Sequence, residues 1–132
     1  MDKPMTKQRI SQYNRLKQEI TMLEGKISAI ETYPDFDMVQ ASVGAGCQKR
    51  DIVVKGFGNK ELPKLYERMR NRQAECHAIE SFINDVDDSI MFQLLTWKYL
   101  EGKTLQETAD KVNYSLSHTI RLIDKFFEEI ES

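Results

Sequence analysis

A long apolar stripe at helical spacing near the N-terminus limits the folds open to this chain more than any other pattern in it. Between residues 6 and 33 the apolar side chains recur at steps of three or four residues, at Ile10, Tyr13, Leu16, Ile20, Leu23, Ile27 and Ile30. This spacing puts them on one helix face, as in the seam of a coiled coil. The helix is expected to end at Tyr33-Pro34, because the residue before a proline is disfavoured in the helical conformation.

A second stripe predicts a second long helix, from about Asn59 to Val86. Asn59 is a suitable N-cap, and Pro63 is tolerated in a first helical turn. The apolar residues on one face are Leu62, Leu65, Met69, Cys76, Ile79, Ile83 and Val86. Two such helices predict an antiparallel, coiled-coil-like hairpin. Because an uncovered seam is a liability, we expect a homo-oligomer, most simply a dimer, formed through the long helices.

The segment between the helices, residues 34–60, has a different composition. Four glycines punctuate two short stretches, Met38–Val43 and Asp51–Lys55, and the second contains the β-branched run Ile52–Val54. Glycine-rich turns between β-branched stretches favour strands. We therefore expect a small β-like insertion, either a hairpin or an ordered loop.

Residues 87–132 are expected to form a separate domain of three short helices. Asp87-Asp88-Ser89 resembles a helix cap, Gly102 can end a helix, and Thr104 with Glu107 forms a capping-box pattern. The predicted fold class is therefore mainly α. A long helical hairpin covers residues 1–86, with the Gly-rich insertion at 34–60, and a helix-turn-helix domain covers residues 87–132.

The segment from Thr104 to Phe127 has the spacing of a helix-turn-helix. Ala109 supplies a small residue where two helices would cross, and Asn113 stands at a turn position that favours a left-handed backbone. Ser115 can cap the second helix. The side chains expected to face inward from that helix are Thr119, Leu122 and Phe126.

Two segments, Ile83 to Ser89 and Trp97 to Ala109, carry a resemblance to a known group of proteins. They resemble small phage and prophage proteins of Gram-positive bacteria that have a sigma-70 region-4-like helix-turn-helix and are largely of unknown function. Where that pattern often has Arg, Trp, Gly and an aliphatic anchor, this chain has Lys98, Leu105, Asn113 and Thr119. The resemblance implies a phage-type DNA-binding transcriptional regulator.

If the domain binds DNA, the contacts are expected from the start of the first motif helix and the outward face of the second. The candidates are Lys103, Thr104, Ser115, Ser117, His118, Arg121 and Lys125. Arg121 offers a two-pronged donor to a guanine edge, whereas Lys103 and Thr104 stand where phosphates are contacted. A second basic stripe, Lys60, Lys64, Arg68 and Arg72, either grips phosphates or is a solvated flank paired with glutamates such as Glu61 and Glu75.

The charge distribution keeps other functions open. Residues 87–132 hold five basic and nine acidic residues, a net charge of −4, which weakens non-specific attraction to DNA. One alternative is a DNA-packaging protein of the small-terminase kind. The other is a protein-interaction module that binds RNA polymerase or another protein through the acidic C-terminal domain.

Enzymatic, cofactor and metal functions are not expected. Cys76 and His77 are adjacent, so on a helix they point apart, and Cys47 and His118 have no neighbours in sequence to complete a site. No nucleophile with a base and an orienting partner can be named. No apolar run approaches the roughly 18 residues of a membrane span. With two cysteines outside any paired motif, we expect a cytoplasmic protein, in the host cell if the gene is a phage gene.

Overall fold

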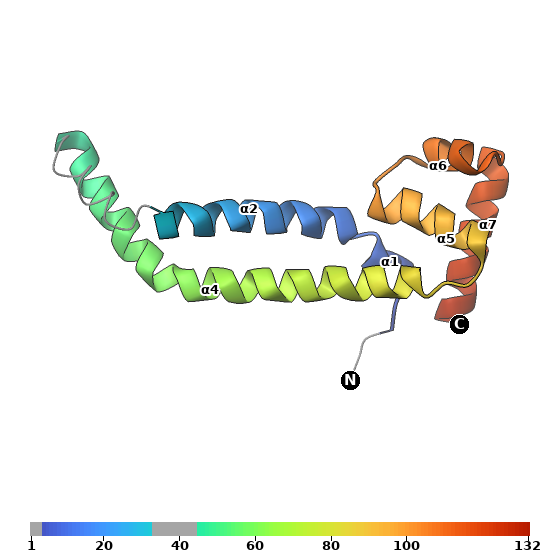
Figure 1. Cartoon of the computed structure of the whole chain (residues 1–132), viewed down its shortest axis with the longest axis horizontal. Coiled ribbons are helices and arrows are strands. Elements are labelled where there is room, and N and C mark those ends of the chain that lie inside the picture. Colours follow the sequence, from blue (N-terminus) through green and yellow to red (C-terminus); the bar gives the residue numbers. More distant parts are fainter. Residues whose placement is uncertain (1–3, 33–44) are drawn as a thin grey trace. The chain divides into compact units, whose positions relative to one another are not determined.

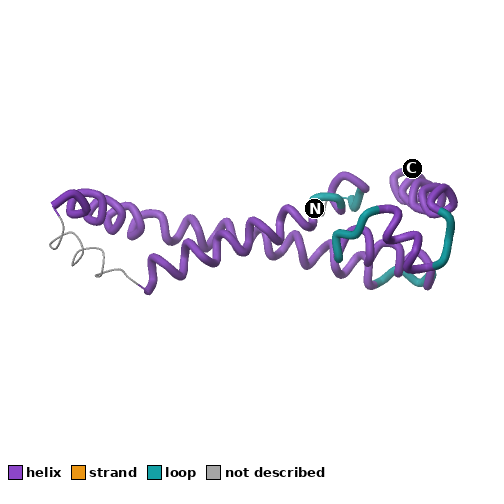
Figure 2. The backbone as a smooth tube through the Cα atoms, turned by 90° about the horizontal axis from the view of Figure 1, so that it is seen from above, coloured by secondary structure: helices purple, strands orange, loops and turns teal. Residues whose placement is uncertain are grey.

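The computed structural model describes residues 4–32 and 45–132, with side chains for 4–32 and 60–132. Its elements are α1 (Lys7–Ile10), α2 (Tyr13–Thr32), α4 (Ala45–Asn84), α5 (Ser89–Leu95), the π-helical turn η1 (Thr96–Leu100), α6 (Leu105–Val112) and α7 (Leu116–Glu131) (Figure 1). The described chain is mainly helical and contains no strand (Figure 2). Within these ranges, no helix combines the length and apolar character that a membrane crossing requires.

The chain divides into two units, which are described separately. The C-terminal unit comprises Met1–Lys17 with Ala74–Ser132, and the long-helix unit comprises Gln18–Gln73. These bounds differ from the expected boundary between residues 86 and 87. The difference arises because the N-terminal segment and the end of α4 pack with the C-terminal helices, with Ile10, Ile79 and Ile83 completely buried.

The predicted N-terminal helix is present as two helices. Thr6 caps α1 by accepting a hydrogen bond from the backbone nitrogen of Arg9 at 3.2 Å, and a turn at residues 11–12 separates α1 from α2. The predicted seam is confirmed for six of its seven members: Ile10, Tyr13, Leu16, Ile20, Leu23 and Ile27 are buried, while Ile30 is half-buried. A single chain therefore covers this stripe without a second copy.

The prediction of a β-like insertion was wrong where the structure describes that segment. Asp51–Lys55 lies within α4, which begins at Ala45 rather than near Asn59. Met38–Val43 lies outside the described residues. β-branched residues have only a context-dependent preference for strands, and an isolated two-stranded hairpin is marginal in water. Extending a helix that already exists instead adds one hydrogen bond per residue. Pro63 consequently lies inside α4 rather than in a first turn.

In the long-helix unit, α2 and α4 are joined by polar pairs on the flank of the seam. Arg68 and Arg72 both donate to the carboxylate of Glu19, the latter from Nε at 3.0 Å, and the hydroxyl of Tyr66 donates to Glu31. Glu19 comes before Glu31 in α2, whereas its partners Arg68 and Arg72 come after Tyr66, the partner of Glu31, in α4. The two helices therefore run in opposite directions here. The α4 side of the contact is only half-buried, at Leu62, Leu65 and Met69.

The ends of the C-terminal helices are held by the residues that the sequence indicated. Asp88 caps α5, because its Oδ1 accepts from the backbone nitrogens of Ile90 at 3.0 Å and Met91 at 3.4 Å. Gly102, after the π-helical turn, has a φ of +72°. This left-handed conformation costs glycine little and ends the helix.

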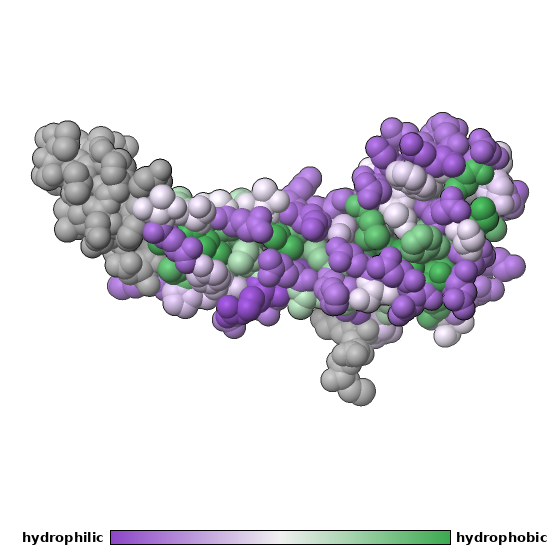
Figure 3. Space-filling model, viewed as in Figure 1, coloured by the Kyte–Doolittle hydropathy of each residue, from purple (hydrophilic) through white to green (hydrophobic). Residues whose placement is uncertain are grey.

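The core of the C-terminal unit is formed where α5 and α6 meet α7. Leu94 and Leu95 of α5 are fully buried, and the ring of Tyr99 meets that of Phe127 edge-on at 5.9 Å between centroids. Figure 3 shows hydrophilic side chains over the outer surface of α6, with apolar side chains visible deeper in the unit.

The inward face of α7 was predicted one residue out of register. Thr119 is buried as expected, but the buried residues that follow it are Ile123 and Phe127, whereas Leu122 and Phe126 are half-buried. α7 packs against both α5 and α6, so its apolar face is wide and its centre depends on where those helices lie. Periodicity alone does not locate that centre.

Candidate nucleic-acid interface

A tight turn sets the start of α7 relative to α6. Asn113 ends α6 in the left-handed conformation, with φ 62° and ψ 37°. The backbone nitrogen of Tyr114 donates to the carbonyl of Ala109 at 3.0 Å, and Ser115 then caps α7 by accepting from the nitrogen of His118 at 3.1 Å. Ala109 and Thr119 are fully buried on the two helices, which are in contact. Local hydrogen bonds and small side chains thus fix this turn.

The outward face of α7 carries three polar side chains in a row. Ser117, Arg121 and Lys125 are all exposed and lie four residues apart, so they share one side of the helix. That side is opposite the one defined by Thr119 and Ile123. We call these three residues the α7 stripe. It offers a hydroxyl, a guanidinium and an ammonium group along about two turns of a capped helix.

His118 is placed differently from the α7 stripe. It is half-buried, and its ring lies against that of Tyr114, with 4.8 Å between centroids. The contact covers part of the imidazole and restrains it beside the first turn of α7. Ser115 is exposed, but its hydroxyl already accepts the capping hydrogen bond. Both residues are at the α7 N-terminus, where the sequence placed them, although neither projects as freely as Arg121.

Lys103 and Thr104 lie at the start of α6, where a carboxylate is also present. Thr104 Oγ1 accepts from the nitrogen of Glu107 at 3.1 Å, and the nitrogen of Thr104 donates to Glu107 Oε1 at 2.9 Å. The backbone and side-chain hydrogen bonds with Thr104 hold the pKa of Glu107 below its ordinary value. The charge of Glu107 therefore occupies the helix end at which a phosphate was expected, and it makes Thr104 the weaker of the two phosphate candidates.

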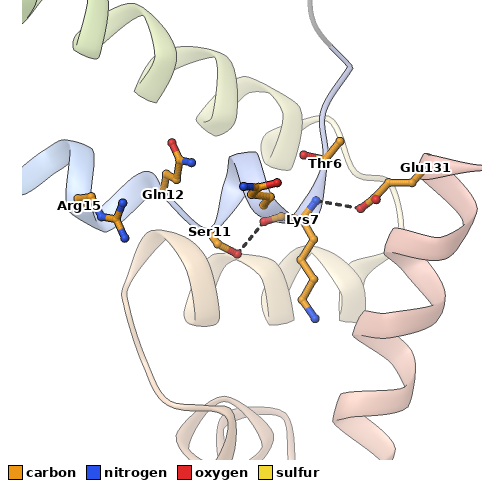
Figure 4. Close-up of a pocket in the computed structure, with 7 residues that line it drawn as sticks. Thr6, Lys7, Ser11, Gln12, Arg15 and Glu131 are labelled. Atoms are coloured by element: carbon orange, nitrogen blue, oxygen red, sulfur yellow. Dashed lines mark hydrogen bonds between the residues drawn. The ribbon is translucent and has the colours of Figure 1, made fainter.

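Two of the acidic residues in α7 are engaged by the N-terminal segment. Lys7 Nζ lies 3.4 Å from Asp124 Oδ1. The backbone nitrogen of Lys7 donates to Glu131 Oε2 at 3.0 Å (Figure 4). Both acids therefore contact α1, and Asp124, three residues after Arg121, also lies beside the α7 stripe and is 55% exposed. No local pattern indicated this pairing, because Lys7 is 117 residues from Asp124. Glu128 and Glu129 remain exposed near the C-terminal end.

A groove beside this contact is lined by α1, the turn that follows it, the start of α2 and the end of α7. Its volume is about 700 Å³, and its lining residues are Thr6, Lys7, Gln8, Ser11, Gln12, Arg15 and Glu131 (Figure 4). The hydroxyl of Ser11 donates to the carbonyl of Lys7 at 2.6 Å, and Lys7 donates to Glu131. The polar groups that could mark this groove as a binding site are thus partly satisfied by one another.

The second basic stripe is largely used within the chain. Lys64 Nζ lies 3.5 Å from Glu61 Oε2, as the flank interpretation expected, and Arg68 and Arg72 pair with Glu19. Lys60 is exposed. The hydrogen bond from Arg68 contributes most to lowering the pKa of the Glu19 carboxyl. Two of the four stripe residues therefore hold α2 against α4.

Glu75, the other glutamate expected to flank that stripe, belongs to the C-terminal unit instead. Its carboxylate receives both prongs of the Arg9 guanidinium, Nε to Oε2 at 2.5 Å and Nη2 to Oε1 at 2.9 Å. A bidentate pair of this kind is geometrically specific and stronger than a single-point contact. It ties α1 to α4 within the unit that presents the α7 stripe.

The other potentially reactive side chains of the described residues do not gather into one cluster. In the part of the chain that the structure describes, no group of three or more His, Cys, Asp or Glu residues could hold a metal ion. Burial raises the pKa of the Cys76 thiol, which favours the unreactive protonated form. Burial first, and then the hydrogen bond to Glu80, raises the pKa of Tyr13. Burial is thus the largest cause of both pKa shifts.

No known protein-family model, curated protein or solved structure matches this chain. The geometry of α6 and α7 is therefore the basis on which a function can be proposed.

Proposed function

We propose that this chain is a phage-type DNA-binding transcriptional regulator in which α6 and α7 act as a helix-turn-helix. The observation that carries the proposal is the α7 stripe: Ser117, Arg121 and Lys125 are exposed in a row on a helix whose start is set by Asn113 and Ser115. A recognition helix needs such a face, because its polar side chains must reach base edges while its other face remains packed.

Each member of the α7 stripe has a distinct role in this proposal. Arg121 donates two hydrogen bonds to the O6 and N7 atoms of a guanine, the commonest specific contact in the major groove. Lys125 and Lys103 contact phosphates, which position the protein without selecting a sequence. Ser117, near the N-terminus of α7, contacts a base or a phosphate.

The pairing of Lys7 supports the proposal by reducing the electrostatic objection. Nine acidic residues among residues 87–132 oppose an approach to DNA, but Asp124 is paired with a lysine from outside that range. The other acids of α7, Glu128, Glu129 and Glu131, lie beyond Lys125. The first two turns of α7, which would enter the groove, have Arg121 as their charged group.

We also propose that the regulator is a homo-oligomer, most simply a dimer. The seam no longer argues for this, because one chain buries Ile20, Leu23 and Ile27 by itself. The remaining reason is the two-fold symmetry of operator sites, which requires two recognition helices about one DNA turn apart, roughly 34 Å. The mass of the protein in solution, measured with and without DNA, checks this part of the proposal.

A second candidate is a protein-interaction module that binds RNA polymerase or another basic partner surface. The observation favouring it is the net charge of −4 over residues 87–132, including exposed Glu128 and Glu129. Acidic surfaces are attracted to basic protein surfaces and repelled by phosphates. The two candidates differ in whether the protein binds DNA at low salt.

The test is DNA binding by the full chain after selection of its preferred duplex from a random library. Arg121→Ala should weaken binding to the selected duplex by about 1–3 kcal/mol while changing binding to random DNA little. Lys125→Ala and Lys103→Ala should weaken both and lower the salt slope by about one unit each. Arg70→Ala is the matched control, because Arg70 is an exposed arginine of the long-helix unit.

The outcomes separate the candidates. Equal binding of wild type and Arg121→Ala to the selected duplex contradicts the role given to α7. Absence of any binding to DNA at low salt contradicts the regulator and leaves the protein-interaction module. Because Arg121 is exposed, its replacement should change the free energy of unfolding by no more than about 0.5 kcal/mol.

A further inference from the structure

The C-terminal unit contains a second cavity, smaller than the groove beside α1. Its volume is about 310 Å³, and residues of α1, η1, α6 and α7 line it. All four elements belong to the C-terminal unit. Cavities between packed helices are common binding places for small molecules, and about 300 Å³ is the lower end of their usual size. This cavity therefore has room for a ligand of a few carbon atoms.

Part of the lining of this cavity is apolar. Leu105, the first residue of α6, is half-buried, and so is Ile120 of α7, whereas Ile123 of α7 is buried. These three branched aliphatic side chains carry no hydrogen-bonding group. They favour a saturated hydrocarbon chain over a polar or strongly hydrated ligand.

The charged part of the lining contains two lysines and one aspartate. Lys7 and Asp124 form an ion pair, with 3.4 Å between Nζ and Oδ1, so their charges offset each other. Lys98 is half-buried, and its Nζ lies 5.2 Å from the centroid of the Tyr99 ring. Among the residues that the structure describes, no carboxylate forms an ion pair with Lys98. The lining therefore has a net charge of +1, carried by Lys98.

The backbone that presents Lys98 to the cavity is unusual. Lys98 and Tyr99 lie in η1, where the nitrogen of Glu101 donates to the carbonyl of Thr96 at 2.9 Å, five residues earlier. π-helical turns are rare and are frequently found at functional sites. This observation is independent of the cavity itself, and it points to the same two residues.

We propose that this cavity binds a small aliphatic carboxylate. The carboxylate group pairs with Lys98 Nζ, and the hydrocarbon chain lies against Leu105, Ile120 and Ile123. A monoanion suits the single net positive charge of the lining. At about 30 Å³ for each water-sized group, the cavity holds about ten such groups, which corresponds to a carboxylate of about six to eight carbons.

The experiment titrates the ¹⁵N-labelled full chain with hexanoate and follows the backbone amide signals by NMR. A ligand of this size should bind with a Kd on the order of 0.1–1 mM. The signals that shift should be those of residues 98–105 and 120–124. Lengthening the ligand from butanoate to octanoate should tighten binding by up to about fourfold for each methylene group.

Two matched ligands test the charge. Hexanamide has nearly the same shape as hexanoate but no charge, and it should bind at least about tenfold more weakly, because a hydrogen bond to a charged group is lost. Hexylamine carries the opposite charge and should bind more weakly than hexanamide. Both comparisons use the wild-type chain, so they do not depend on the folding of any variant.

Variants of the lining test the position of the ligand. Lys98→Met keeps an apolar stem without the ammonium group and should weaken hexanoate binding at least about tenfold. Lys98→Arg keeps the charge and should retain binding, whereas Ile120→Phe fills part of the cavity and should weaken it. Lys26→Met is the matched control, because Lys26 is an exposed lysine of the long-helix unit, and it should leave binding unchanged.

Equal affinity for hexanoate and hexanamide would overturn the proposal, as would hexanoate binding that survives Lys98→Met undiminished. Amide shifts confined to residues outside 98–105 and 120–124, or no shifts at all, would overturn it as well. None of these measurements involves DNA. Failure of this inference therefore leaves the proposed function standing, and failure of the proposed function leaves this site standing.

Discussion

The C-terminal unit and the long-helix unit hold their helices together in different ways. In the C-terminal unit, caps at Asp88, Thr104 and Ser115 and a left-handed turn at Asn113 fix the helix ends, and the core is enclosed by several helices. In the long-helix unit, the apolar residues that α2 contributes to its contact with α4 are buried, whereas those of α4 are only half-buried. Polar pairs such as that of Arg68 with Glu19 lie along the flank of this contact.

This contrast indicates where precise geometry is to be expected. Short helices with fixed ends can hold a row of side chains in a defined register, which recognition of base edges requires. A pair of long helices packed along one seam has fewer neighbours to hold each side chain. The α7 stripe, with Ser117, Arg121 and Lys125, therefore belongs to the unit that holds its side chains more firmly. The basic stripe of α4 lies in the long-helix unit, which holds them less firmly.

The greatest loss of stability is expected from removing a core leucine in each unit. Leu94→Ala and Leu23→Ala both delete buried side chains, which costs about 2–5 kcal/mol depending on how far the site collapses. Leu94 is fully buried on α5, which packs against both α6 and α7, so the cavity should persist and the cost should lie near the upper end. Leu23 lies between two helices that can approach each other, so its cost should be lower.

Urea unfolding of the two variants, followed by circular dichroism, measures this difference. Equal losses for Leu94→Ala and Leu23→Ala would mean that the seam is as closely packed as the C-terminal core. The control is Leu122→Ala, a half-buried leucine of α7, for which the loss should be smaller than for Leu94→Ala.

Intermediate changes in stability are expected from alanine substitutions at two backbone positions, one destabilising and the other stabilising. Asn113 has φ 62°, so Asn113→Ala should destabilise the C-terminal unit by about 1–2 kcal/mol, whereas Asn113→Gly should not. Gly25 lies inside α2, and a Cβ added there would meet nothing within 4 Å. Gly25→Ala should therefore stabilise α2 by about 1 kcal/mol. Thermal melting of the three variants checks these signs, and a destabilised Gly25→Ala would indicate that α2 approaches another surface at that residue.

A smaller change is expected from an ion pair of the long-helix unit. Arg68 is 55% exposed, so Arg68→Ala should cost about 0.2–1 kcal/mol, and the cost should fade in about 1 M salt. Because Arg68 lowers the pKa of Glu19, this stabilisation is present above the ordinary value of 4.5 and is lost as the pH falls through the lowered one.

Arg9→Ala is the matched variant in the C-terminal unit. The Arg9 side chain is 20% exposed and its partner Glu75 31%, and their contact is bidentate. Arg9→Ala should therefore lower the free energy of unfolding by more than Arg68→Ala does, and its effect should depend less on salt. Unfolding measured at two salt concentrations compares the two variants. Equal losses of stability with equal salt dependence would contradict the distinction between the units.

Features that depend on neighbouring residues could be predicted from the amino-acid sequence alone. The caps at Asp88, Thr104 and Ser115, the left-handed turn at Asn113 and the buried seam of α2 were all predicted, because each depends on residues within one or two helical turns. The exposure of Arg121 and Lys125 followed from the same periodicity.

Features that depend on distant partners became visible only in the folded chain. The local pattern did not decide that residues 51–55 are helical or that α1 belongs to the C-terminal unit. Nor did it decide that Ile123 and Phe127, rather than Leu122 and Phe126, are the buried residues of α7. The same holds for Lys7 with Asp124 and for Glu19 with two arginines of α4. Charge and apolar periodicity specify that a side chain needs a partner or a neighbour, whereas only the packing of the chain determines which one it meets.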